Sequence, residues 1–127
     1  MKILIVDDKQ TVLSSLTALL ENAGHCVVTA SNGLDGFEKA QSQPFDLFVI
    51  DHLMPVMNGL VLVKNLRQHL DTQHAPILFM STQGVESLKA LPEYPMFTFS
   101  IAKPIDEQEL FFVINQLSIQ NSQSQSL

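Results

Sequence analysis

Four apolar runs in the sequence are each followed at once by a side chain that can take part in ion or phosphate chemistry. Asp7 and Asp8 follow KILIV, Asp51 follows LFVI, Ser81 follows ILFM, and Lys103 follows TFSIA. Carboxylates held close together repel and raise one another's pKa values, so something positive must offset the repulsion. A hard divalent cation such as Mg²⁺, which prefers oxygen ligands, is the natural candidate.

The remaining side chains of the set fit one kind of reaction. Lys103 supplies an ammonium that can reach a carboxylate or a phosphoryl oxygen, and Ser81 supplies a hydroxyl donor. A carboxylate surrounded by a metal, a lysine and a hydroxyl is suited to phosphoryl transfer with Asp51 as the nucleophile. Taken singly, these residues could be a helix cap, a loop acid, a surface lysine and a strand-end hydroxyl. Their occurrence at four separate strand ends favours a shared site.

The elements that must position these residues alternate between strands and helices. Five apolar segments are expected to form strands, at Lys2–Val6, Cys26–Ala30, Asp46–Ile50, Ile77–Met80 and Phe97–Ala102. Apolar residues at helical spacing predict helices over Thr11–Ala23, Leu34–Gln41, Gly59–His69, Val85–Leu91 and from Asp106 to about Ile119. This alternation predicts a parallel α/β sheet covered by helices on both faces, with its chemistry at the carboxyl ends of the strands.

Composition sets the broad class. The 127 residues are 46% hydrophobic and 16% charged, which is typical of one globular domain. A formal net charge of −6 argues against nucleic acid or an anionic membrane as a direct partner. The amino-terminal apolar run is too short for a secretory signal, and we therefore expect a cytoplasmic protein.

Several residues are interpreted as having no role in the chemistry. Cys26 is expected to be a small apolar residue of a core strand. Met54 and Met57 are expected to pack within their loop. The four histidines have no metal-ligand spacing and are expected to face solvent, namely His25, His52, His69 and His74. For His52, which follows Asp51, the less favoured alternative is an influence on the lifetime of a phosphoryl group on that carboxylate.

The motifs, their order and their spacing resemble the receiver domain of two-component response regulators, the CheY-like superfamily. The segments that carry the resemblance are VDD, VIDHLMPVMNG, ILFMST and AKP. The resemblance covers the chain from Met1 to about Ile119. It implies a three-layer, doubly wound, flavodoxin-like fold whose five parallel strands lie in the order 2-1-3-4-5.

The resemblance also assigns a role to each residue of the acidic group. Asp51 matches the phosphoacceptor. Asp8 matches a direct ligand of Mg²⁺, and Asp7 matches an acid that holds the metal through water. Leu53 would contribute its backbone carbonyl to the metal, so its side chain need not be polar.

The other two site residues correspond to groups that contact the phosphoryl group. Ser81 stands where the family has Thr or Ser, and Lys103 matches the family's lysine. The peptide bond from Lys103 to Pro104 is expected to be cis. The phosphoryl group would come from a histidine kinase or a histidine phosphotransfer protein.

The sequence departs from the family pattern in the region that follows the fourth strand. Thr82 stands where a smaller residue is usual and should narrow access to the acceptor. Ser100 replaces an aromatic switch residue. Pro92 and Pro95 interrupt the expected fourth helix, which indicates a nonstandard partner surface.

Three functions follow from these observations. The first is a receiver that switches state when Asp51 is phosphorylated. The second is a pseudo-receiver that acts as an interaction module without phosphorylation. The third, ranked last, is a Mg²⁺-dependent phosphohydrolase, which lacks a second acid at Leu53 and a substrate-cap domain. We expect a signalling domain and not an enzyme.

The domain is expected to span residues 1–119, and residues 120–127 are interpreted as a polar tail or the start of a linker. The chain is therefore either a stand-alone receiver or a fragment of a longer regulator. Its downstream partner would be a separate protein or a missing output domain, and a second copy of the chain, in a homodimer, is a further candidate partner.

Overall fold

The computed structural model describes the backbone of residues 1–125 and the side chains of residues 1–119. The elements in chain order are β1 (Lys2–Val6), α1 (Gln10–Asn22), β2 (Cys26–Ala30), α2 (Gly33–Ser42), β3 (Leu47–Asp51), α3 (Gly59–Gln68), β4 (Ile77–Ser81), α4 (Val85–Lys89), the 3₁₀ turn η1 (Tyr94–Met96), β5 (Phe99–Ala102) and α5 (Glu107–Gln125). None of these helices is both long and apolar enough to cross a membrane.

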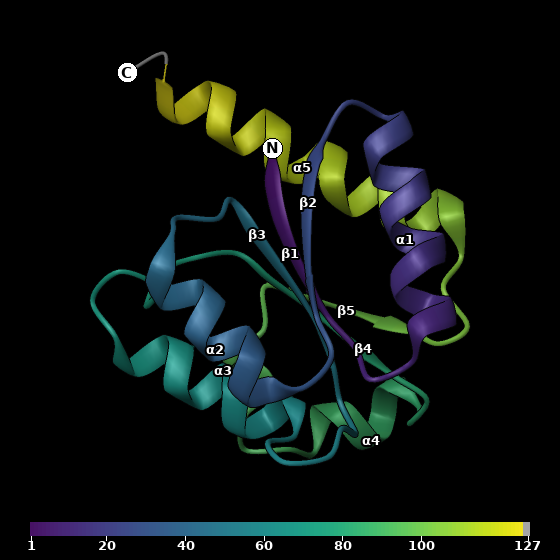
Figure 1. The fold of residues 1–127 in the computed structure, drawn as a ribbon, viewed down its shortest axis with the longest axis vertical. Coiled ribbons are helices and arrows are strands. Elements are labelled where there is room, and N and C mark those ends of the chain that lie inside the picture. The colour runs from purple at the N-terminus through teal and green to yellow at the C-terminus, as the bar shows by residue number, and fades with distance from the viewer. Residues whose placement is uncertain (126–127) are drawn as a thin grey trace.

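The five strands form one parallel sheet in the order β2-β1-β3-β4-β5, which confirms the predicted topology (Figure 1). The register aligns the carboxyl ends of the strands. Val6 pairs with Ile50, Asp51 with Met80, and Ser81 with Ala102. Residues that follow different strands are therefore brought to one edge of the sheet.

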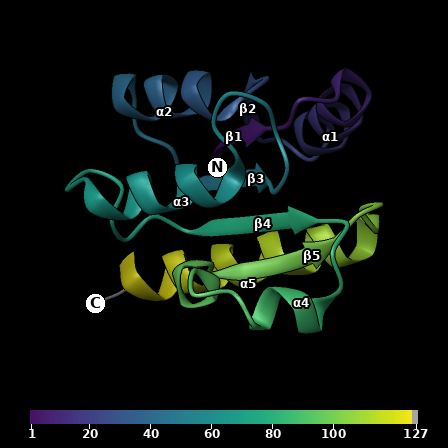
Figure 2. The same cartoon turned by 90° about the horizontal axis from the view of Figure 1, so that it is seen from below.

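Side chains alternate along each strand, so the sheet has two buried faces. Ile3, Val49 and Met80 belong to the core that packs against α1 and α5. Leu4, Ile50 and Phe79 belong to the core on the other face, which α2 and α3 cover together with Leu88 of α4. Figure 2 shows α5 and the pair α2 and α3 on opposite sides of the sheet. Burial on both faces explains why the strands read as continuous apolar runs.

The predicted bounds are correct for β1 and β2, and those of α1, α2, α3 and β4 differ from the structure by one residue at one or both ends. The other four elements, α4, β5, β3 and α5, differ as follows. α4 ends at Lys89, before the expected Leu91, because the Leu91 N–H bonds three residues back, to the Leu88 carbonyl. β5 begins at Phe99 and not at Phe97, because the Phe97 N–H still closes η1. β3 begins at Leu47, one residue after the expected Asp46.

α5 continues beyond the end expected near Ile119 and reaches Gln125. Residues 120–125 contain neither Pro nor Gly, so no residue there breaks the helix. The start of α5 is as expected, because the Asp106 side chain accepts a hydrogen bond from the Glu109 N–H at 3.1 Å. The proposed domain boundary at residue 119 remains a prediction.

The expectation for Cys26 is wrong. β2 is an edge strand, and Cys26 at its first position is exposed. Met54 is buried in the core covered by α2 and α3, and Met57 packs against that core, which confirms that both residues are structural.

The segment between α4 and β5 is fastened to α3. Arg67 donates hydrogen bonds to the carbonyl oxygens of Met96, at 2.8 and 3.0 Å, and of Ala75, at 2.6 Å. Lys64 forms an ion pair of 3.1 Å with Glu93, which is buried. These contacts explain how a segment with two prolines and only one helical turn keeps a defined position.

The loop between β3 and α3 closes against the end of β3. The Gly59 N–H donates to the carbonyl of His52 at 2.8 Å, and Asn58 caps α3 by accepting from the Val61 N–H. A Cβ atom at Gly59 would lie 2.0 Å from the carbonyl oxygen of Asp51. Only glycine permits this approach, so the position of Gly59 and that of the Asp51 backbone depend on each other.

We therefore expect Gly59→Ala to lower the free energy of unfolding by about 1–3 kcal/mol, as overpacking against a backbone atom does. Gly84→Ala is the matched control, because a Cβ at Gly84 meets nothing within 4 Å. The control should change stability by less than about 1 kcal/mol. Urea unfolding of both variants tests this, and equal effects would contradict the role given to Gly59.

Candidate functional site

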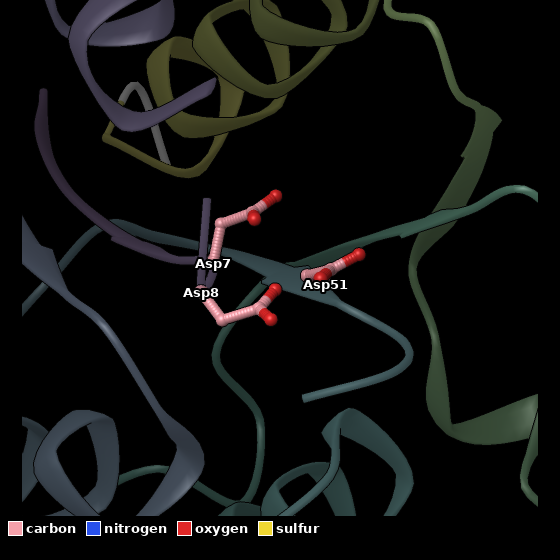
Figure 3. A group of neighbouring side chains, drawn as sticks. All are labelled: Asp7, Asp8 and Asp51. Carbon is pink, nitrogen blue, oxygen red and sulfur yellow. The ribbon is translucent and has the colours of Figure 1, made fainter. Parts of the chain in front are cut away.

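Three carboxylates meet at the carboxyl edge of the sheet. Asp7 and Asp8 follow β1 and Asp51 ends β3, and each offers an oxygen within 4.8 Å of the others (Figure 3). Asp7 and Asp51 are buried, whereas Asp8 is exposed. The structure thus brings together the three acids that the sequence singled out.

Hydrogen bonds that extend the sheet fix the backbone at this edge. The N–H groups of Asp7, His52 and Lys103 donate to the carbonyl oxygens of the neighbouring strands, at 3.1, 2.9 and 2.9 Å. The strand ladder therefore continues into the site and orders the backbone of the residues that follow β1, β3 and β5.

Lys103 lies between two of the carboxylates. Its Nζ atom is 2.9 Å from Asp7 Oδ2 and 3.0 Å from Asp51 Oδ1, and its side chain is only 9% exposed. Burial lowers the pKa of Lys103, but the hydrogen bonds to Asp7 and Asp51 outweigh burial, and the net pKa is raised. Lys103 is therefore charged at neutral pH. The bond from Lys103 to Pro104 is cis, as the resemblance implied.

The environment of Asp51 disfavours its charge. Burial raises the pKa of Asp51, the hydrogen bond from Lys103 lowers it, and the charges of Asp7 and Asp8 raise it, with a net increase. One ammonium faces three carboxylates, which leaves two uncompensated negative charges when all three are ionised. Oxygen donors with that excess charge fit a hard divalent cation such as Mg²⁺.

The hydrogen bonds that the structure shows for the Ser81 hydroxyl involve neither the carboxylates nor Lys103. Its Oγ accepts from the Gln83 N–H at 3.0 Å and lies 2.9 Å from Nδ1 of His52. The His52 ring is half-buried, with its centroid 5.2 Å from that of Phe79. Burial lowers the pKa of His52, and the charge of Glu93 offsets this only in part.

The expectation that all four histidines face solvent is wrong for two of them. His52 contacts Ser81, and half-buried His25 has Nδ1 3.1 Å from the terminal amine. His69 and His74 are exposed, as expected. The missed signal for His52 is the register, since Asp51 opposes Met80 and the next pair along is His52 and Ser81.

The remaining predicted residues lie where the strand ends place them. Thr82 is exposed beside Ser81, and Ser100 is half-buried on β5 opposite Phe79. The Leu53 side chain is 58% exposed, and the role given to its carbonyl stays a prediction. Phe79 stacks on Phe97, with 4.1 Å between ring centroids and 5° between ring planes. This stack lies near Ser100, the position at which the family has an aromatic residue.

The fold and the site together define a doubly wound α/β domain with a carboxylate cluster and a lysine at its switch-point edge. Residues 3–115 match the family model of the response regulator receiver domain. The chain belongs to this family of signalling domains.

Two relatives and two solved structures illustrate the similarity. The chain is 35% identical to protein PilH of Pseudomonas aeruginosa over 114 residues, which cover 90% of this chain and 94% of PilH. It is 37% identical over 90 residues to the transcriptional regulatory protein PhoP for alkaline phosphatase synthesis of Bacillus subtilis, which cover 71% of this chain but only 37% of PhoP.

Among solved structures, the chemotaxis protein CheY4 of Vibrio cholerae is 30% identical, with a TM-score of 0.84 and coverage of 91% of this chain and 97% of that one. The response regulator TrrA of Thermotoga maritima, in complex with Mg²⁺ and BeF, is 25% identical, with a TM-score of 0.82 and the same coverage.

The raised pKa of Asp51 predicts an effect on stability. The folded state holds the Asp51 proton more tightly than the unfolded chain, so ionisation destabilises the metal-free protein as pH rises above the ordinary value of 3.8. Asp51→Asn should therefore raise the free energy of unfolding at pH 7 in the presence of a chelator, and the gain should vanish at acid pH, where Asp51 is protonated in both states.

Urea unfolding across this pH range measures the effect. Asp71→Asn is the control, because this substitution removes the same formal charge at an exposed position. A loss of stability for Asp51→Asn at pH 7 would show that the attraction of Lys103 outweighs burial.

Proposed function

We propose that this chain is a phosphoacceptor that takes a phosphoryl group on Asp51 and thereby changes its interaction with a downstream protein. The observation that carries the proposal is the placement of a buried carboxylate between Lys103 and two further acids at the strand ends. A nucleophile, a cation for the phosphoryl oxygens and a set of metal ligands are thus within reach of one another.

In the proposed reaction a carboxylate oxygen of Asp51 attacks the phosphorus atom and forms an acyl phosphate. The bond from phosphorus to the donor breaks, and its electron pair leaves with the donor, which for a phosphohistidine is the imidazole. Lys103 exchanges its hydrogen bond to Asp51 for one to a phosphoryl oxygen, and Ser81 donates its hydroxyl to another.

Mg²⁺ is the proposed cofactor, held by Asp7, Asp8, Asp51 and the Leu53 carbonyl. When bound it would neutralise negative charge that develops on the transferring group. The similar structure of TrrA in complex with Mg²⁺ and BeF supports this part of the proposal. The oxygen-only donor set and the two uncompensated charges support it from this chain.

The proposed donor is a histidine kinase or a histidine phosphotransfer protein. A cytoplasmic location fits that partner. The shortened α4 and the fastened η1 segment support a nonstandard surface for the downstream partner. The phosphohydrolase alternative is not favoured, because Leu53 occupies the position of its second acid.

The first test is intact mass after incubation with Mg²⁺ and acetyl phosphate. The wild type and Asp71→Asn should each gain one phosphoryl group, and Asp51→Asn should gain none because its amide is not a nucleophile. A chelator should abolish the adduct. If the wild type gains no phosphoryl group and also fails to bind beryllofluoride with Mg²⁺, the pseudo-receiver becomes the better interpretation.

Thr82 supplies a second prediction, because its side chain is exposed and directly follows Ser81 in the chain. Thr82→Ala should speed both phosphorylation by acetyl phosphate and hydrolysis of the product, since small molecules and water then approach Asp51 more freely. Ser87→Ala on α4 serves as the control. Unchanged rates in Thr82→Ala, measured by the decay of the phosphorylated mass, would rule out a role in access.

A further inference from the structure

The hydroxyl of Ser81 is engaged away from the ion-paired carboxylates. Asp51 pairs with Met80, and both side chains point to the face of the sheet covered by α1 and α5. Because side chains alternate along a strand, the side chain of Ser81, the residue after Met80, leaves the backbone on the opposite face. There its Oγ lies 2.9 Å from His52 Nδ1 and accepts from the Gln83 N–H. Ser81 must therefore turn about its Cα–Cβ bond to reach a phosphoryl group on Asp51.

A serine hydroxyl has one proton and two lone pairs. The Gln83 N–H occupies one lone pair, and His52 takes either the proton or the second lone pair, according to its tautomer. In both cases the bond to His52 holds Oγ beside the imidazole ring, and rotation of Oγ toward Asp51 breaks that bond. Where Nδ1 accepts the hydroxyl proton, a phosphoryl oxygen also competes with the imidazole for the proton itself.

Packing against aromatic residues restrains the imidazole ring of His52, so the ring does not move with Ser81 when that side chain rotates. The ring lies against Phe79, which also stacks on Phe97 with 4.1 Å between ring centroids. Tyr94 packs edge-on against Phe97, and Arg67 and the pair of Lys64 and Glu93 fasten that segment to α3. His52 thus rests on a packed aromatic support.

We propose that His52 is a positioning residue that holds the Ser81 hydroxyl in the phosphoryl-free conformation and competes with the phosphoryl group for it. This inference rests on the proposed function, because it concerns the same site. It gives His52 a role that opposes phosphoryl binding, although His52 lies next to the acceptor in the chain.

A double-mutant cycle on the full chain tests the competition. The readout is the dissociation constant for beryllofluoride in the presence of Mg²⁺. His52→Leu should bind roughly 2- to 10-fold more tightly than the wild type, the equivalent of one neutral hydrogen bond. In a Ser81→Ala background, which has no hydroxyl to hold, His52→Leu should have no effect on binding.

The conservative variant His52→Asn separates the hydrogen bond from the ring. An asparagine amide carries a donor and an acceptor close to the position of Nδ1, so it should restore most of the wild-type affinity. Urea unfolding of each variant confirms that the folded protein is compared. Weaker binding by His52→Leu, or an equal change in both backgrounds, would overturn the proposal.

A second readout needs no metal or phosphoryl group. In ¹⁵N spectra of the metal-free protein, Ser81→Ala should shift the Nδ1 resonance of His52 and leave those of exposed His69 and His74 in place. An unmoved His52 resonance would overturn the contact itself. If the wild type takes neither beryllofluoride nor a phosphoryl group, the proposed function fails and this inference fails with it, whereas binding without the expected cycle refutes the role of His52 alone.

Discussion

Mutual repulsion among three carboxylates governs the construction of this edge of the sheet. Asp7 and Asp51 are buried, and burying a charge is costly unless a partner compensates it. Lys103 provides that partner by bonding to both acids, and its removal would leave both buried carboxylates without a compensating charge. The compensation is incomplete, however, and the remaining negative charge is what makes the edge receptive to a cation and, with it, to a phosphoryl group.

The parallel sheet is what brings these charges together, and it is the part of the structure that the sequence predicted best. Continuous apolar runs identify strands buried on both faces, and the residue after each run falls at the common edge. Asp51 and Lys103 could be placed in this way because each directly follows such a run. The periodicity of apolar residues does not determine the order of the strands, and that order was predicted from the family resemblance.

The residues whose environment was predicted wrongly are those whose position depends on which strands lie next to one another, and the sequence of a single strand does not contain that information. Cys26 looks like a core residue, but whether a strand lies at the edge depends on its neighbours. The contact between His52 and Ser81 could be predicted only from the pairing of β3 with β4. The packing of the proline-containing segment likewise depends on Arg67 of α3, whose carbonyl partners lie in two separate loops.

The extension of the strand ladder through Asp7, His52 and Lys103 has a consequence for the timescale of the response. Because their backbone is already ordered, adjustment to an ion or to a modified Asp51 requires only rotation of side chains. A rotation at an exposed position such as Asp8 takes picoseconds to nanoseconds, whereas collective shifts of elements take microseconds or longer. The exposed side of the site can thus respond to an ion well before the surrounding helices rearrange.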